Sequence, residues 1–442
     1  MNKNKENIIV ASLLIGGILV PLNSTMIAVA LSSMASALNE SLWMITWVVT
    51  IYFIVMAVLQ PIAGKLGDLF GYRRLYLSGV VLFIIGSLGS GMSPNLELLI
   101  GSRALQAIGG ALLTPNSTAL LRLTLSEEKL SKTLGLFGLT SGLGAVLGPL
   151  VGGALIGIFD WHAIFLINLP LMVLSLVLSI VFIPKVNQEK LDKPLDFLGS
   201  ILLAISIASL ALLSKSESTG SMTGYAVFFA IALLLFFLRE KKAKDPIIKL
   251  SLFKNSVFTA ANLSVAISNF VMYAILLIIP LLMASQFQIS ETISGLFLSL
   301  FSISLSVSSF IGGRIHQRLG ARKLVSYSFI GLVVVNMGFS LGIIISSWPL
   351  ILIFLIIGGI AIGIAMPSMQ MAYLSAVDPN MSGSASGIFS TFRYLGGIAS
   401  SVLITVMSGF QYLFLLFAAV SLFGIVISRL YNRLEVNAMR HE

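Results

Sequence analysis

The sequence predicts an all-α integral membrane protein, and three observations carry that prediction. The chain has 442 residues, of which 57% are apolar and only 10% are charged, whereas soluble proteins carry about a quarter charged residues. Its mean hydropathy is +1.01. Apolar runs of about 18 residues or more recur along the whole length, each long enough to cross a hydrocarbon core of about 30 Å. Such continuous runs predict helices, because a β-barrel would show short strands of alternating polarity.

Fourteen apolar segments are expected to form the transmembrane helices. The first is too long for a cleavable signal peptide, and no small-residue cleavage site follows it. An even number of spans places both termini on the same side of the membrane. In order, the expected spans are residues 8–31, 43–63, 75–93, 96–121, 131–159, 161–183, 196–213, 224–238, 256–285, 292–313, 324–346, 349–374, 384–408 and 410–428.

The positive charge follows this topology. When the loops alternate, all 27 Lys and Arg residues fall on the side of the termini except Lys215, on the opposite side, and Arg103 and Arg393, within spans. The positive-inside rule then places both termini in the cytoplasm. The net charge of +10 is explained by this orientation and by contact with anionic membrane lipids. Nucleic acid is therefore not expected as a partner.

An internal repeat divides the chain. GKLGDLFGYRR (64–74) recurs as GRIHQRLGARK (313–323), and AIGGALLTPNS (107–117) resembles GIAIGIAMPSM (359–369) at nearly the same offset. Two six-helix copies separated by two extra spans are therefore expected. The expected domains are an N-terminal six-helix bundle (1–190), an inserted two-helix hairpin (191–245) and a C-terminal six-helix bundle (246–442). Membrane proteins built from two similar halves are commonly transporters with a site between the halves.

The segment 64–74 is expected to form a tight turn between two helices. Its glycines permit close approach and a positive φ. Asp68 is able to accept hydrogen bonds from a helix N-terminus, and Arg73 and Arg74 to reach carboxylates or helix C-termini. The second copy has Gln317 in place of Asp68, so the first copy is expected to act as a latch. The alternative is an ordinary solvated loop.

Arg103 is expected within a span, about 10 Å from its outer end. A buried arginine is costly and normally faces a water-filled cavity or partner groups. Gln106, one turn further on, lies on the same helix face. A functional role is favoured, and a structural brace for unwound carbonyl groups is the alternative.

The segment SGLGAVLGPLVGGAL contains Gly144, Gly148 and Gly152, which recur every four residues. They predict a face without side chains that lets another helix approach closely. Pro149 removes a helical hydrogen bond and bends the helix. The segment is expected to be a packing face and a hinge.

Taken in order, GKLGDLFGYRR, LLIGSRALQAIGG and GAVLGPLVGG resemble the three signature motifs of the major facilitator superfamily. DWHAIFLINLP, LDFLG, PIIKLSLFKNSVF and ASGIFSTFRYLGG resemble its fourteen-span drug:proton antiporter branch, home of quinolone and antiseptic efflux pumps. The resemblance covers nearly the entire chain. It implies a major facilitator fold, in which two bundles rock about a central cavity and export lipophilic, often cationic drugs in exchange for protons. It also implies that Arg103 assists proton movement and that Asp68 and Arg74 belong to a gating loop.

The first span departs from the family pattern. The family usually has Leu-Asp-x-Thr there, whereas this chain has Leu22, Asn23, Ser24 and Thr25. An asparagine amide offers two donors and an acceptor, but it binds no proton. None of the 17 acidic residues is expected near the middle of a span.

Two hypotheses about proton coupling follow from this departure. In the first, protons are carried near the outer mouth. In the second, coupling is weak or absent and the cavity favours neutral or anionic compounds. The candidates for proton coupling under the first hypothesis are Glu97, Glu40, Asp160 and Arg103.

Polar and adaptable side chains are expected to line the cavity. For the amides, hydrogen bonding between helices is the alternative role, and for the methionines and aromatic residues it is ordinary packing. The expected cavity residues are Asn23, Met26, Met56, Gln60, Arg103, Gln106, Asn116, Asn269, Phe270, Tyr273, Gln370, Phe389 and Arg393.

These patterns predict a secondary active multidrug exporter of a bacterial cell membrane, driven by the proton gradient and working by alternating access. The chain has no Walker sequence and no cysteine, so ATP, metals and cofactors are not expected. The alternative function is a facilitator or exporter of an endogenous metabolite or lipid. A membrane sensor is disfavoured because no soluble domain is evident, and an intramembrane enzyme because no catalytic cluster is.

Overall fold

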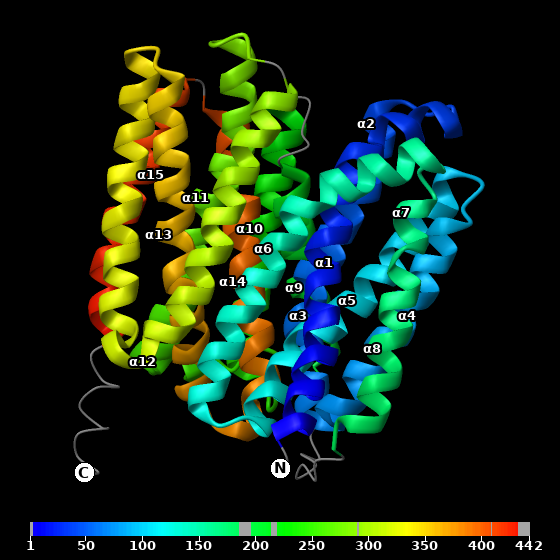
Figure 1. The fold of residues 1–442 in the computed structure, drawn as a ribbon. Coiled ribbons are helices and arrows are strands. Elements are labelled where there is room, and N and C mark those ends of the chain that lie inside the picture. Colours follow the sequence, from blue (N-terminus) through cyan, green and yellow to red (C-terminus); the bar gives the residue numbers. More distant parts are fainter. Residues whose placement is uncertain (1–2, 185–195, 214–218, 290, 408, 432–442) are drawn as a thin grey trace. The chain divides into compact units, whose positions relative to one another are not determined.

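The computed structural model describes residues 3–184, 196–213, 219–289, 291–407 and 409–431, which are almost entirely helical (Figure 1). Helices predominate because each satisfies its backbone hydrogen bonds internally, which an apolar surrounding requires. The α-helices are α1 (Lys3–Leu38), α2 (Leu42–Ile45), α3 (Trp47–Phe70), α4 (Tyr72–Gly91), α5 (Leu96–Thr124), α6 (Glu127–Ile158), α7 (Ala163–Leu166), α8 (Asn168–Phe182), α9 (Phe197–Leu213), α10 (Thr219–Lys242), α11 (Ser256–Ser285), α12 (Glu291–Ile344), α13 (Trp348–Ser375), α14 (Ser382–Val406) and α15 (Phe410–Ser428). The 3-10 helices are η1 (Leu250–Lys254), η2 (Pro379–Met381) and η3 (Arg429–Tyr431).

Ten helical segments in the described parts of the chain are long and apolar enough to cross a membrane. One of them lies in α12, whose 54 residues far exceed the roughly 20 that one crossing needs. Gly320 has non-helical backbone angles and divides α12 into two helical segments. The predicted all-helical membrane architecture is confirmed, whereas the count of fourteen spans and the inserted hairpin stay predictions.

The repeated motif forms a turn of a single residue in each copy. Gly71, with φ 98°, separates α3 from α4, and Gly320, with φ 74°, occupies the matching position in α12. Glycine adopts such positive φ values without steric cost. The turn predicted along 64–74 is therefore confined to Gly71, because the flanking residues continue the two helices beyond the apolar runs.

By their contacts the helices form two compact units. The first comprises residues 1–127, 140–195 and 378–390, and the second residues 128–139, 196–377 and 391–442. In the first unit α4 packs on α5 and α8, α3 packs on α5, and α1 packs on α5 and α8. In the second unit α12 packs on α13 and α15, α11 packs on α13 and α15, and α9 packs on α10. The predicted domain boundaries stay predictions.

An apolar cluster occupies one part of the first unit. It is built from α1, α3, α5 and the segment around α7, and it includes the fully buried side chains of Met34, Val48 and Phe165. Met26, expected to line a cavity, packs within the same cluster. This cluster forms the apolar surroundings of the candidate site described below.

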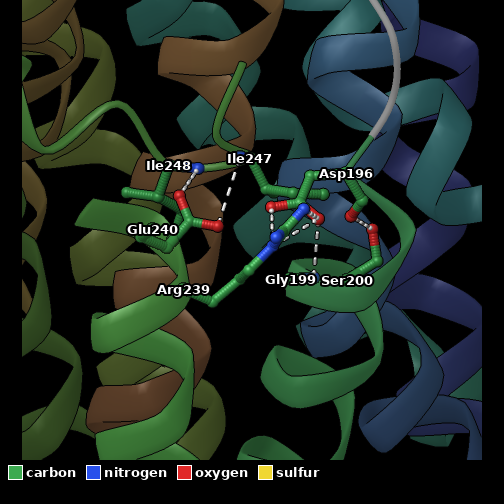
Figure 2. Close-up of polar contacts among 7 residues, drawn as sticks. All are labelled: Asp196, Gly199, Ser200, Arg239, Glu240, Ile247 and Ile248. Carbon is green, nitrogen blue, oxygen red and sulfur yellow. Dashed lines mark hydrogen bonds and ion pairs between the residues drawn. The ribbon is translucent and has the colours of Figure 1, made fainter. Parts of the chain in front are cut away.

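A polar junction fixes the adjoining ends of α9 and α10 (Figure 2). In the last turn of α10, Arg239 donates from Nη2 to Asp196 Oδ1 over 3.0 Å. Asp196, which precedes α9, also accepts the N–H of Gly199 at 3.1 Å. Glu240 accepts the N–H groups of Ile247 and Ile248 at 3.3 and 3.0 Å. Asp196 thus fixes the start of α9, and Glu240 fixes the turn after α10. We call the contacts made by Asp196, Arg239 and Glu240 the α9–α10 junction.

Candidate functional site

A buried guanidinium between α1, α3 and α5 forms the centre of the candidate site. Arg103 is only 1% exposed and lies about 10 Å along α5 from its first residue. Its Nη1 donates to Asn23 Oδ1 of α1 at 2.6 Å and to Gln106 Oε1, one turn further on. Its Nε donates to the carbonyl oxygen of Val48 in α3 at 3.2 Å. Three helices therefore meet at one cation.

Aromatic rings complete the surroundings of this cation. The guanidinium carbon lies 4.2 Å from the ring centroid of Tyr52 and 5.8 Å from that of Phe165, distances at which ring faces attract a cation. Gln106 in turn donates to Ser87 Oγ of α4 at 2.7 Å. We call these residues the Arg103 cluster: Asn23, Val48, Tyr52, Ser87, Arg103, Gln106 and Phe165. Tyr52, Ser87 and Phe165 were not predicted, because isolated aromatic or serine residues on apolar helices resemble ordinary packing residues in sequence.

All the acceptors that bind Arg103 are neutral. Among the described residues no carboxylate contacts it, and Glu97, in the first turn of α5, is exposed. Asn23 is fully buried, and its Nδ2 has no hydrogen-bond partner within the described chain. The cluster therefore combines an uncompensated positive charge with an unused donor. Since a buried charge is costly in a membrane, such a site is expected to be functional.

A second polar site lies where α3 meets the start of α14. The Asp68 carboxylate is 5% exposed and accepts the N–H groups of Gly383 and Ser384 at 2.9 and 3.0 Å. It also accepts the hydroxyl of Ser384 and that of Tyr72 at 2.8 Å. The unpaired N–H groups and the dipole of a helix N-terminus favour a negative charge. The predicted ability of Asp68 to bind a helix N-terminus matches these contacts, and we call this site the Asp68 junction.

Glycines allow α3 and α14 to approach closely at this junction. A Cβ on Gly383 would lie 2.6 Å from Asp68 Oδ1, and one on Gly387 would lie 2.7 Å from the Cα of Pro61. Both distances are shorter than any real Cβ contact. Arg122 of α5 adds a bond from Nη1 to the Ser382 hydroxyl at 2.8 Å. Three helices are thereby joined around Asp68.

The two arginines of the motif differ in their contacts. Arg73 donates from Nε to the carbonyl oxygen of Ile183 at 2.9 Å and from Nη2 to that of Ile180 at 2.8 Å. These carbonyl groups lie at the C-terminal end of α8, where a cation is favoured, as the sequence predicted. Arg74 is exposed. Arg73 therefore ties α4 to α8.

The glycine face of α6 packs against α1. A Cβ on Gly144 would lie 3.0 Å from the carbonyl oxygen of Ile18, and one on Gly152 would lie 3.2 Å from the Cα of Met26. Gly148, between them, is buried. These contacts agree with the expected close approach, while the side chain of Pro149 lies outside the described residues.

The remaining candidates in the first unit are buried. Met56 and Gln60 are fully buried, and neither side-chain polar atom of Gln60 has a partner within the described chain. Asn116 donates to the carbonyl oxygens of Ala63 and Leu112 at 3.2 and 2.7 Å, so it bonds α5 to α3, the alternative role considered for the amides. Phe389 is 3% exposed.

The candidates in the second unit lie on α11, α13 and α14. Asn269 donates to the carbonyl oxygen of Val265 at 3.0 Å, and Phe270 packs against Phe417 with ring centroids 5.1 Å apart. Gln370 is half-buried, and its Oε1 has no partner within the described chain. Tyr273 and Arg393 are both half-buried.

The acidic residues considered for proton coupling lie near helix ends, away from Arg103. Glu97 is exposed and Glu40 is half-buried. Asp160 is exposed and accepts the backbone N–H of His162 at 2.8 Å. The contacts of the described residues thus leave the Arg103 cluster without an acid, as expected from Asn23.

Comparison with known proteins finds a matching family model and similar transporters. The family model described as Major Facilitator Superfamily matches residues 13–401 and 261–440. An uncharacterized MFS-type transporter of Bacillus subtilis (strain 168), YvkA, is 51% identical over 428 residues, 97% of this chain and 96% of that protein.

Relatives with named activities are more distant. Multidrug resistance protein 3 of the same organism is 30% identical, covering 88% of this chain and 77% of its own length. The riboflavin transporter RibZ of Clostridioides difficile (strain 630) is 29% identical, with 88% and 85% coverage. The structure of the proton:xylose symporter XylE is similar in fold, with a TM-score of 0.72, 14% identity, and 96% and 95% coverage.

Proposed function

Because the chain belongs to the major facilitator superfamily, we propose that it is a secondary active multidrug exporter. It expels amphipathic lipophilic drugs and dyes in exchange for protons, by alternating access. The observation that carries this proposal is the Arg103 cluster, a buried polar site built from α1, α3, α4 and α5. Ionisable groups at such depth mark substrate and ion pathways. The similarity to Multidrug resistance protein 3 supports the substrate class.

The proposed topology has fourteen spans, with α9 and α10 forming a hairpin inserted between two six-helix bundles. The division of α12 at Gly320 and the lengths of α1 and α6, 36 and 32 residues, support this count. The distribution of Lys and Arg supports a cytoplasmic location of both termini. The related transporter in Bacillus supports a bacterial cell membrane.

The Asp68 junction supplies the conformational part of the proposal. Opening the protein between α3 and α14 breaks the four hydrogen bonds of a buried carboxylate. Such bonds to a charged group contribute about 1.5–3 kcal/mol each. The junction therefore favours the closed arrangement until hydration of the carboxylate or the free energy of substrate binding offsets the loss of these bonds. Gln317, at the matching position of the second copy, is exposed, which supports a latch in the first copy only.

Proton exchange is proposed to occur at the outer ends of the helices. Glu97, Glu40 and Asp160 are the acids available there, since the acceptors of Arg103 are all neutral. Arg103 then acts on the proton through its positive charge alone. A favoured alternative function is export of an endogenous metabolite with weak or no proton coupling, which the missing carboxylate and the similarity to a riboflavin transporter support.

Ethidium transport by the purified full chain in proteoliposomes tests this proposal. We expect an imposed pH gradient to drive ethidium movement, and Asp68→Asn to slow it roughly tenfold or more because the amide cannot satisfy the four donors. Asp378→Asn is the matched control, since Asp378 is an exposed carboxylate near the same junction that caps η2.

Three outcomes separate the hypotheses. Movement that ignores the pH gradient contradicts proton antiport and favours the alternative function. Equal rates for Asp68→Asn and the wild type contradict the latch. No movement of ethidium or of any drug in a susceptibility panel contradicts multidrug export itself.

A further inference from the structure

The second unit contains its own guanidinium at membrane depth. Arg393 lies in α14, roughly 16 Å along the helix from Ser382, and it is half-buried. A side chain near the middle of a 25-residue helix is too far from either end to place its charge at a membrane surface. Its charge must therefore be accommodated inside the protein.

Arg393 has no acceptor within the described chain. No hydrogen bond or ion pair joins it to a described residue, and its guanidinium carbon lies 5.3 Å from the ring centroid of the adjacent Tyr394. Four helices of this unit, α11, α13, α14 and α15, contain no Asp or Glu. An arginine that only stabilised the fold would be expected to bind carboxylate or carbonyl oxygens.

A phenol faces the same space as this guanidinium. Gly397, one turn after Arg393 on the same face of α14, approaches α11 so closely that a Cβ there would lie 2.8 Å from Tyr273 Cδ2. The Tyr273 hydroxyl makes no hydrogen bond to a described residue and is half-buried. Two groups that donate hydrogen bonds thus lie together, and neither finds an acceptor among the described residues.

The two units show the same imbalance of charge. In the first, Arg103 is bound only by neutral acceptors, and Asn23 Nδ2 is an unused donor. In the second, Arg393 and Tyr273 bind no acceptor in the described part of the chain. Each observation stands independently of the other, and both leave positive charge inside the membrane with no carboxylate to balance it.

We infer that the transported compounds include organic anions, and that Arg393 with Tyr273 binds the carboxylate or an equivalent acidic group of the substrate. This inference rests on the proposed export function and narrows its substrate class. The planar fork of a guanidinium matches a carboxylate with two parallel hydrogen bonds, and a phenol adds a third donor. A cationic group would instead be repelled at this pair by the charge of Arg393, since charge interactions are strong in a low-dielectric interior.

Three probes that share one fluorophore test the inference. Dansylglycine carries a carboxylate, its methyl ester is neutral, and dansylethylenediamine carries an ammonium group. Binding to the purified full chain is measured by dansyl fluorescence. We expect dansylglycine to bind roughly tenfold or more tightly than the other two, the ratio expected from one charge-assisted hydrogen bond.

Variants locate the binding group. Arg393→Gln is expected to weaken dansylglycine binding roughly tenfold or more while leaving the ester unchanged, and Arg393→Lys to retain part of the preference. Arg314→Gln is the matched control, because Arg314 is an exposed arginine that also stacks on an aromatic ring, with its guanidinium carbon 4.2 Å from the Phe310 centroid. The Arg314→Gln variant is expected to bind all three probes as tightly as the wild type does.

The results distinguish this inference from the proposed function. Equal binding of dansylglycine and its ester, tighter binding of the amine, or an equal effect of Arg393→Gln on all three probes would overturn the inference, even if ethidium is transported. A carboxylate preference that depends on Arg393, with no transport of any probe in proteoliposomes, would support the site and overturn export. Absence of both binding and transport contradicts both.

Discussion

The arginines of the Arg103 cluster and of the α9–α10 junction differ in burial and in the charge of their binding partners. Arg239, at the end of α10, is 40% exposed in its side chain and still binds the carboxylate of Asp196 at 3.0 Å (Figure 2). Arg103 is almost fully buried and binds only amide and carbonyl oxygens and ring faces. Burial makes an unpaired charge more costly, yet the buried Arg103 has no carboxylate partner among the described residues and the more exposed Arg239 has one.

This difference agrees with the proposed function, in which Arg239 serves the fold and Arg103 serves transport. An ion pair at an accessible helix end contributes little energy, but it fixes the geometry of α9 and α10. A buried cation without a carboxylate partner contributes less to the stability of the fold than a paired one, because its desolvation is not offset by an opposite charge. Its presence is therefore better explained by the proposed role in transport than by a role in stability.

The largest effect is expected from removing the buried cation. Arg103→Leu leaves the oxygens of Asn23, Gln106 and Val48 without a donor, so the free energy of unfolding should fall by about 3–5 kcal/mol. Thermal unfolding in detergent, followed by tryptophan fluorescence, measures the change. Arg103→Lys, which keeps the charge, should lose less; an Arg103→Leu variant as stable as the wild type would contradict the contacts described for the cluster.

A smaller effect, of opposite sign, is expected when the missing acid is supplied. Asn23→Asp places a carboxylate beside Arg103 Nη1 and makes the cluster resemble the α9–α10 junction. The variant should be more stable by about 1–3 kcal/mol, because bonds between charged groups are stronger than neutral ones.

The matched variant Asn23→Ala separates charge from contact. It removes the same acceptor without adding charge and should lower stability. The comparison between the two regions would be wrong if Asn23→Asp were destabilised to the same extent as Asn23→Ala.

The smallest effect is expected at the α9–α10 junction. Asp196→Asn weakens the bond to Arg239, whose side chain then turns to water at little cost. Thermal stability should change less than in Arg103→Leu or Asn23→Asp, and binding of all three dansyl probes should stay as in the wild type. A loss of dansylglycine binding in this variant would assign the junction a part in transport.

Much of the fold follows from patterns that act locally. Continuous apolar runs predicted the helices, and the repeated glycine motif predicted the turns, since only glycine adopts the φ of Gly71 and Gly320 at no cost. The neutral surroundings of Arg103 were predictable from the absence of acids at that depth. The binding of Arg73 to the end of α8 was also expected from charge alone.

The remaining features depend on contacts between distant segments. Tyr52 and Ser87 join the Arg103 cluster through helix packing that no local pattern encodes. Asn116, expected in a cavity, bonds α5 to α3 instead. The pairing of Asp196 with Arg239 joins residues 43 positions apart, and the sequence offered only an acid before an apolar run and a basic segment after one.

The charge preference of transport tests the central claim most directly. Proteoliposomes containing the full chain are given dansylglycine and dansylethylenediamine under the same pH gradient, and the initial rates are compared. Two arginines without a carboxylate partner among the described residues predict that dansylglycine moves roughly tenfold faster or more, and that Arg393→Gln removes most of this difference. Equal rates, or faster movement of the cationic probe, would contradict the account.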